Sequence, residues 1–330
     1  DVSYYAGHFH PAKAPGASLL AVPGYAVIRG LEGLAGLPPD RWAVLTINAW
    51  LVSVLSVGLV SALGAVLVLR LACALAPVRD AALTALVFAF GTMMWPHATL
   101  LFEHNVVAVA LLAAFYCIER ARQAGPRAGR LSQRRHCSDG LLACAGLCAG
   151  YAAVCNYAMA VLVLVFWGYA ILRHGCWPAS LWFGLGVMGP LLLVCGYHQI
   201  CFGTPFTTNY FYENPVFVSE HHLLGVFAVP RVDVALTLLF SPFRGLFFTS
   251  PVLLLGVAGL VAMLHDRGPK EWGWLSAVVA GFLLLLNASF NGWDGGWTAV
   301  PRYLGPAMPF LVLPIATAWN RWFRTTSLLA

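Results

Sequence analysis

Charged side chains are scarce in this sequence: 10% of its 330 residues are Asp, Glu, Lys or Arg, against about a quarter in soluble proteins. So few charges cannot cover a water-facing surface of normal size. This excludes soluble enzyme folds, disordered tails and disulfide-rich secreted domains. A hydrophobic content of 60% and a mean hydropathy of +0.77 indicate an integral membrane protein instead.

Several sequence signatures are also missing. No two of the nine cysteines are spaced as CxxC, so we interpret them as small buried hydrophobic residues. No GxxxxGKS loop is present, and a nucleotide sugar therefore has no visible binding element. Signatures of Ser and Cys nucleophiles are absent as well. The net charge of +6 is typical of cationic loops beside a membrane, and we do not expect nucleic acid as a partner.

Runs of about 20 apolar residues are the expected unit of a membrane-crossing helix. They predict an all-α, polytopic transmembrane helix bundle with about nine spans: 43–69, 81–95, 98–118, 140–155, 157–172, 178–201, 246–264, 272–290 and 304–319. We expect residues 1–42 to form an outer-face loop with an interfacial helix. Residues 43–330 then form the membrane domain, with outer loops at 203–245 and 291–303.

Arginines set the expected orientation of these spans. The segment 119–136 carries six of them, including Arg127 and Arg130, and the positive-inside rule places it in the cytoplasm. Alternation then puts residues 1–42, the turn 95–97 and the loops after 202 and 290 on the outer face. The loops predicted inside carry a net charge of +8 and those outside −2, which together make the +6 of the chain.

Three outer segments carry side chains suited to chemistry, and the first is 4–16. Its Gly and Pro residues frame Lys13 ahead of an apolar stretch, 17–30, that is too short to span the membrane. A lysine in front of a helix start can place its ammonium beside an anionic head group. It can equally snorkel at the membrane interface without a further role.

The second segment runs from Trp95 to Asn105. His97 and His104 are seven residues apart, which places them on nearly one helix face. We expect Glu103 about 9 Å below the outer end of its helix, at 1.5 Å per residue. A charge at that depth is costly in lipid, so it should face a protein cavity, either in a functional site or in a structural Glu–His pair.

The third segment is the loop 291–303. Trp293 and Asp294 lie in a Gly-rich stretch, where an aromatic face beside a carboxylate suits a sugar, although tryptophan is also typical of interfacial belts. Arg302, followed by Tyr303, suits a phosphate because its planar guanidinium can bind two oxygens. Arg244 offers a second arginine at an outer helix start.

These segments resemble bacterial multi-spanning glycosyltransferases of the GT-C superfamily, near the protein O-mannosyltransferase and aminoarabinose transferase families. The stretches that carry the resemblance are HFHPAKAPG at 8–16, WPH at 95–97, SPFRGLF at 241–247, GWDGGW at 292–297 and PRY at 301–303. The resemblance implies a polyprenyl-phosphate-linked sugar as donor and a glycan, lipid or protein as acceptor on the outer, periplasmic or extracellular face. It also implies a bacterial inner membrane, with membrane lipids as neighbours, and it leaves a divalent metal open.

The same resemblance assigns roles to single residues. Lys13 matches a lysine that meets the donor phosphate, and Arg302 an arginine that closes the same pocket. The superfamily's principal carboxylate follows its first span in an acidic motif that either precedes Asp1 or ends in it, so an upstream segment is expected. Asp1 and Glu103 are thus the catalytic candidates, and the substrate-binding candidates are Lys13, His97, His104, Arg244, Trp293, Asp294, Arg302 and Tyr303.

Two alternatives belong to other classes of protein. A polytopic transporter also has many spans and proline-broken helices, but it binds its substrate near the bilayer midplane. Here the charged residues gather at the outer ends of the spans, which favours an interfacial site. A noncatalytic GT-C-like membrane protein would account for the missing acidic motif.

Overall fold

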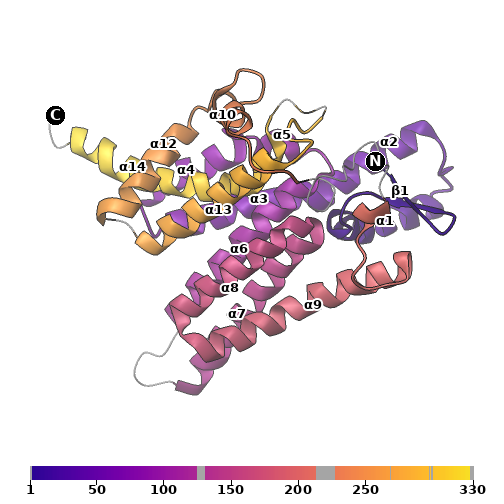
Figure 1. The fold of residues 1–330 in the computed structure, drawn as a ribbon, viewed down its shortest axis with the longest axis horizontal. Helices are drawn as coiled ribbons and strands as arrows, with labels where there is room; N and C mark the ends of the chain where they lie inside the picture. The colour runs from indigo at the N-terminus through magenta and orange to yellow at the C-terminus, as the bar shows by residue number, and fades with distance from the viewer. Residues whose placement is uncertain are drawn as a thin grey trace.

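The computed structural model describes residues 2–124, 131–212, 227–267, 269–296, 298 and 300–327, and it is built of helices apart from one hairpin in this part of the chain (Figure 1). Asp1, Arg127, Arg130, Trp297 and residues 213–226 of the predicted outer loop lie outside the described residues. The hairpin pairs β1 (Val2–Tyr5) with β2 (His8–Pro11) in antiparallel register.

The helices follow in chain order. They are α1 (Gly16–Leu34), α2 (Trp42–Ser53), the π-helix η1 (Val54–Gly58), α3 (Leu59–Ala72), α4 (Val78–Phe90), α5 (Met94–His97), α6 (Glu103–Ala124), α7 (Leu131–Cys155), the 3-10 helix η2 (Tyr157–Met159), α8 (Ala160–His174), α9 (Cys176–Phe202), the 3-10 helix η3 (Asn209–Tyr212), α10 (Val232–Phe240), α11 (Leu246–Thr249), α12 (Leu253–Ala262), the π-helix η5 (Met263–Arg267), α13 (Lys270–Ser289), the 3-10 helix η6 (Arg302–Ala307) and α14 (Met308–Ser327).

Among the described residues, six helices are long and apolar enough to cross a membrane. They are Trp42–Ala72, Glu103–Ala124, Ser138–Cys155, Tyr157–His174, Ala179–Phe202 and Lys270–Ser289. By length and composition the chain is therefore a multi-pass helical membrane protein. The other three predicted spans fall on shorter or interrupted elements: α4 has 13 residues, 246–264 is divided among α11, α12 and η5, and 304–319 begins in η6.

The interfacial stretch after Lys13 forms α1, which ends in a hydrogen-bonded cap. Gly36 takes the left-handed conformation, with φ at 65°, and its N–H donates to Gly33 O. The next N–H, of Leu37, donates back to Glu32 O. This Schellman arrangement satisfies the last carbonyls of the helix and turns the chain toward α2.

Helix α6 lies at the centre of the bundle and packs on α3 and α7, while α7 packs along α9 (Figure 1). The α7–α9 contact depends on glycine. A Cβ atom at Gly146 would lie 2.0 Å from Phe183 O, and one at Gly186 would lie 2.0 Å from Ala143 O. Small residues let membrane helices approach to backbone contact, since lipid offers no hydrophobic force that drives helices together.

The outward face of α9 is apolar and exposed. Its exposed large side chains are Leu181, Leu185, Met188, Leu191, Leu192, Leu193 and Ile200. A soluble protein rarely exposes an apolar surface of this extent, whereas a lipid-facing helix requires one. The surface of this helix thus agrees with its assignment as a membrane span.

Candidate functional site

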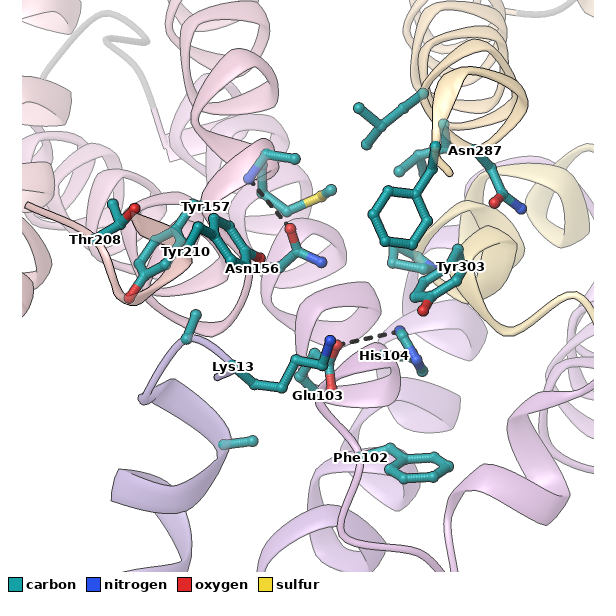
Figure 2. Close-up of a pocket in the computed structure, with 18 of the residues that line it drawn as sticks. Lys13, Phe102, Glu103, His104, Asn156, Tyr157, Thr208, Tyr210, Asn287 and Tyr303 are labelled. Atoms are coloured by element: carbon teal, nitrogen blue, oxygen red, sulfur yellow. Dashed lines mark hydrogen bonds and ion pairs between the residues drawn. The ribbon is translucent and has the colours of Figure 1, made fainter. Parts of the chain in front are cut away.

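A cavity of about 1390 Å³ lies where the predicted outer ends of several segments meet. Its walls come from the turn before α1, the start of α6, η2 with the start of α8, η3, the end of α13, and η6. Figure 2 shows Lys13, Glu103 and His104 at its centre, with Tyr157 on one side and Tyr303 on the other. Pockets for drug-sized ligands hold about 300–1,000 Å³, so this cavity has room for a larger molecule.

Lys13 enters the cavity because the turn that carries it is fastened to the segment after α9. Asn209 Nδ2 donates a hydrogen bond of 2.9 Å to Pro11 O, two residues before the lysine. Ser3 of the hairpin donates to Asn209 O at 2.9 Å. The hairpin and η3 are thereby joined, and the turn between β2 and α1 is held over the cavity.

The far side of the same turn is fastened to α7. The Tyr151 hydroxyl donates to Gly16 O at 2.8 Å. A Cβ atom at Gly16 would lie 2.5 Å from Cys155 Sγ and 2.6 Å from its backbone nitrogen. Only glycine permits this approach, so the geometry of the turn depends on Gly16.

Glu103 is the first residue of α6, so the expected depth of about 9 Å below the helix end is wrong. The cause is a break in the predicted span: α5 ends at His97, and residues 98–102 form a turn before α6. A carboxylate in the first turn is stabilised by the positive end of the helix dipole. Its Oε1 lies 3.8 Å from His104 Nδ1, and it also interacts electrostatically with Lys13 and Arg302.

Asn105 and Gly305 fix the start of α6. Asn105 Nδ2 donates to Met94 O at 2.9 Å and to Ser61 Oγ at 2.8 Å, which ties α6 to α5 and α3. A Cβ atom at Gly305 would lie 3.2 Å from the Cβ of His104, so η6 packs directly on α6. These contacts place η6, and with it Arg302, beside Glu103.

Arg302 is held between aromatic rings at the cavity wall. Its guanidinium carbon lies 5.5 Å from the ring centre of Phe102 and 4.9 Å from that of Tyr303, and its NH2 donates to the Tyr303 hydroxyl at 2.9 Å. Its Nε is buried and has no hydrogen-bond partner in the described part of the chain. The hydrogen bond to Tyr303 uses one of the five N–H groups of the guanidinium, and Arg302 is among the residues that line the cavity.

His97 lies behind the cavity rather than in its wall. Its ring centre is 5.8 Å from that of His104. The two residues belong to different helices, α5 and α6, so the prediction that they share one helix face is wrong. Burial, aided by the charges of His104 and Arg302, lowers the pKa of His97 from 6.5 to about 4. The imidazole is therefore neutral at pH 7 and supports His104 as a packing partner.

The wall opposite Arg302 is polar but uncharged in the described residues. It contains Asn156, Tyr157, Thr208 and Tyr210, and the rings of the two tyrosines meet edge to face at 5.6 Å and 86°. Tyr157 is hydrogen-bonded to His198, which lies outside the cavity. The sequence places Asn156 at the break between two short predicted spans, on the predicted outer face, but it assigned no binding role to this residue or to Tyr157.

The rest of the lining is apolar and aromatic. It includes Val161 at the start of α8, Phe282 and Leu286 of α13 with Phe290 just after it, Phe211 of η3, and Phe206 and Phe227 outside the helices. On both helices the apolar surface continues outward, through exposed Leu164 on α8 and exposed Leu285 on α13. The cavity is thus bordered by surfaces that face lipid in a membrane.

The structure therefore brings five of the sequence candidates together: Lys13, Glu103, His104, Arg302 and Tyr303. Arg244, Trp293 and Asp294 are not in the cavity wall. Arg244 is 7% exposed and donates to Gly296 O at 2.5 Å, while Trp293 packs against the hydrophobic core. Aromatic rings in the cavity wall come instead from residues that include Tyr157, Tyr210 and Phe290.

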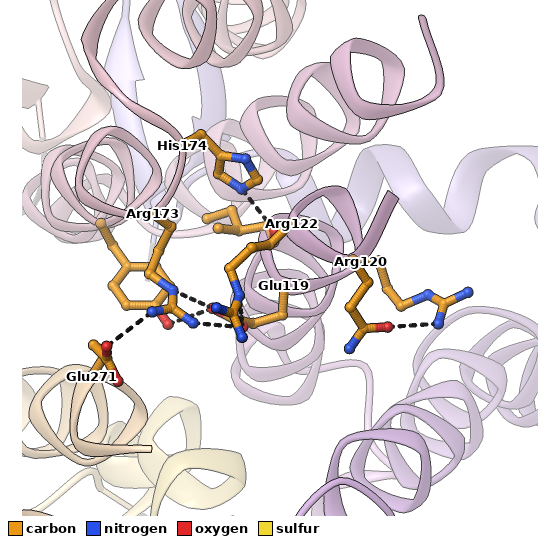
Figure 3. A network of polar contacts seen from close by, with 9 residues as sticks. Glu119, Arg120, Arg122, Arg173, His174 and Glu271 are labelled. Carbon is orange, nitrogen blue, oxygen red and sulfur yellow. Dashed lines mark hydrogen bonds and ion pairs between the residues drawn. The ribbon is translucent and has the colours of Figure 1, made fainter. Parts of the chain in front are cut away.

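A network of charges closes the opposite end of the bundle (Figure 3). Arg173 of α8 donates from Nε and NH2 to Glu119 of α6, at 3.0 and 3.1 Å, and its NH1 lies 3.1 Å from Glu271 of α13. The Tyr169 hydroxyl also donates to Glu119, at 2.6 Å. These ends of α6, α8 and α13 were all predicted to lie on the inner side, and the network shows that they share one side.

Comparison of the chain with protein-family models, with curated proteins and with solved structures gives no match. The site must therefore be interpreted from its own geometry. Among the described residues, no group of three or more His, Cys, Asp or Glu side chains lies close enough together to hold a metal ion.

Proposed function

We propose that this protein is a membrane glycosyltransferase that moves a sugar from a polyprenyl-phosphate donor to an acceptor at the predicted outer, periplasmic face of a bacterial inner membrane. One observation carries the proposal. Lys13 and Arg302, from opposite ends of the chain, line the same cavity together with Glu103. Two cations that converge from distant segments on an interfacial cavity favour a phosphate as the ligand.

The charges of the cavity support a ligand with a single negative charge. Lys13 and Arg302 each contribute a positive charge, and Glu103 contributes a negative one, so one positive charge is left to be balanced. A sugar joined to a polyprenyl phosphate is a phosphodiester, which carries one negative charge. After transfer the phosphate gains a second negative charge, and the same cations then stabilise the leaving group.

The apolar part of the cavity supports a lipid as the carrier of that phosphate. The lining residues Val161 and Phe282 belong to α8 and α13, whose exposed surfaces continue into the predicted membrane. An isoprenoid chain can follow this surface while its phosphate reaches Lys13 and Arg302. A free nucleotide sugar would leave the apolar walls without a partner.

The transfer itself needs a proton acceptor for the attacking hydroxyl. In the reaction the acceptor oxygen bonds to the sugar's C1, the bond between C1 and the phosphate oxygen breaks, and the electron pair leaves with the phosphate. Glu103 is the carboxylate that lines the cavity in the described part of the chain, and we assign it the role of base. Asp294 lies elsewhere, and Asp1 is not among the described residues.

The transporter alternative requires polar groups near the bilayer midplane. Here Glu103 is the first residue of α6, Tyr157 is the first of its span, and Asn287 lies near the end of α13. The cavity therefore lies at the ends of the helices, which favours a lipid substrate over a solute that crosses. Vesicles containing the protein should show no ion-coupled solute uptake.

The direct test is sugar transfer by the full-length protein in lipid nanodiscs, with polyprenyl phosphate esters of glucose, mannose, galactose and arabinose as donors. Lys13→Ala and Arg302→Ala should each lower kcat/KM about 10- to 150-fold, since a hydrogen bond to a charged group contributes about 1.5–3 kcal/mol. Arg41→Ala, which removes an exposed arginine from the same predicted face, is the matched control. Unchanged transfer in both cavity variants, with intact folding, would overturn the proposal.

A further inference from the structure

The amide of Asn156 has a fixed orientation at the cavity wall. Its Oδ1 accepts a hydrogen bond of 3.1 Å from the backbone N–H of Ala158 and so caps η2. A backbone N–H can only donate, which identifies the other atom of the amide as Nδ2. That nitrogen, a donor, points into the cavity (Figure 2).

The hydroxyl of Tyr157 has the opposite polarity, and a backbone group fixes it as well. His198 Nδ1 lies 3.3 Å from Pro205 O, and because a carbonyl can only accept, Nδ1 carries the proton. His198 is 4% exposed and pairs with no carboxylate in the described residues, so its ring is neutral and Nε2 is an acceptor. The Tyr157 hydroxyl, 2.9 Å away, must donate its proton to Nε2.

The wall therefore contains a donor at Asn156 and, at the following residue, a phenol oxygen of Tyr157 that can only accept. A sugar hydroxyl both donates and accepts, and two neighbouring hydroxyls can use both groups at once. The wall has no charged side chain among its described residues, and the edge-to-face ring of Tyr210 adds an aromatic surface for the C–H groups of a sugar.

We propose that Asn156 and Tyr157 form a subsite for sugar hydroxyl groups, in which Asn156 donates to one hydroxyl and Tyr157 accepts from it or from its neighbour. The inference rests on the proposed function and deepens it, because it states which chemical group the sugar must present. A methylated or fluorinated position cannot donate to Tyr157. The hydroxyl can belong to the donor sugar or to a saccharide acceptor, and both have the same chemistry.

The test is a double-mutant cycle between the protein and its ligand. Affinity is measured in nanodiscs for polyprenyl phosphate alone, for its glucose ester, and for glucose esters in which one hydroxyl at a time is replaced by fluorine. In the wild type, one fluorinated position should bind about tenfold more weakly, which corresponds to one lost hydrogen bond. In Tyr157→Phe that difference should vanish, while polyprenyl phosphate alone binds as before.

Tyr197→Phe is the matched control. The Tyr197 ring touches the ring of His198 at 5.8 Å, yet the residue does not line the cavity, so this variant should keep the tenfold discrimination. Asn156→Asp retains an oxygen for Ala158 and replaces the donor by an acceptor, and it should weaken binding of the glucose ester. A second arm repeats the cycle with methyl glucoside and its fluorinated forms as acceptors in the transfer assay, which identifies the source of the hydroxyl.

The outcomes separate this proposal from the proposed function. If Tyr157→Phe leaves discrimination at every position of both donor and acceptor unchanged, the hydroxyl subsite is wrong, although the phosphate site stands. If polyprenyl phosphate binds with the same affinity to the wild type and to Lys13→Ala and Arg302→Ala, the phosphate site is wrong, and the subsite falls with it.

Discussion

Replacing Glu119 by glutamine should lower the free energy of unfolding by about 3 kcal/mol, because it leaves the guanidinium of Arg173, whose side chain is 10% exposed, without its nearest counter-charge. Glu119 is 3% exposed and accepts two hydrogen bonds from Arg173, at 3.0 and 3.1 Å. Breaking a buried pair by removing one partner costs about 3–5 kcal/mol. Glutamine keeps a carbonyl oxygen for the Tyr169 hydroxyl, which places the expected loss at the lower end of that range.

Glu271→Gln is the matched control for this prediction. Glu271 lies 3.1 Å from the same guanidinium, but its side chain is 55% exposed, and exposed pairs contribute less than about 1 kcal/mol. Unfolding is followed by circular dichroism in mixed micelles as SDS is added. Glu119→Gln should shift the equilibrium about 150-fold toward the unfolded state, and the Glu119→Leu/Arg173→Met double variant should recover most of this loss. Small and equal losses in Glu119→Gln and Glu271→Gln would refute the reasoning.

Two further predictions concern stability. Gly146→Ala should lower the free energy of unfolding by about 1–3 kcal/mol, since its Cβ would lie 2.0 Å from Phe183 O. Gly168→Ala, whose Cβ would have no atom within 4 Å, should stabilise the protein slightly. Equal effects of the two substitutions in the unfolding assay would contradict the close approach of α7 and α9. His97, with its pKa lowered from 6.5 to about 4, takes up a proton more readily in the unfolded state. Its contribution to the free energy of unfolding, at most about 3 kcal/mol, is therefore fully present above pH 6.5 and decreases as the pH falls toward 4. His97→Gln should flatten the dependence of this free energy on pH. A variant whose slope against pH equals that of the wild type would contradict the prediction.

The parts of the site that the sequence predicted are those set by membrane topology. Charges are costly in lipid, so polar residues gather at the ends of spans, and alternation then assigns each end to a side. This reasoning placed Lys13, Glu103 and Arg302 on one face without any knowledge of packing. The structure adds that they share a cavity, because η6 packs on α6 at Gly305 and the turn before α1 packs on α7.

The parts that the sequence did not predict depend on local breaks and on tertiary contacts. Residues 98–102 are mostly apolar, so hydropathy alone extended the predicted span 98–118 through a turn. The prediction therefore missed that α6 begins at Glu103. Trp293 offers an aromatic face of the kind that stacks on sugars, yet its side chain packs on the hydrophobic core. The subsite at Asn156 and Tyr157 is invisible in sequence because its polarity is set by Pro205, which lies 48 positions after Tyr157.

The two ends of the bundle use buried charge in different ways, and the difference bears on function. At the end predicted to be inner, the oxygens of Glu119 accept from Arg173 and Tyr169, so the charges satisfy one another and their effect is to stabilise the fold. At the cavity, the Nε of Arg302 is buried with no partner in the described residues, and Glu103 is 3.8 Å from its histidine. A buried donor left unsatisfied costs about 1–3 kcal/mol. Arg302 also lines the cavity, and under the proposed function the remaining N–H groups of its guanidinium bind the phosphate of the donor.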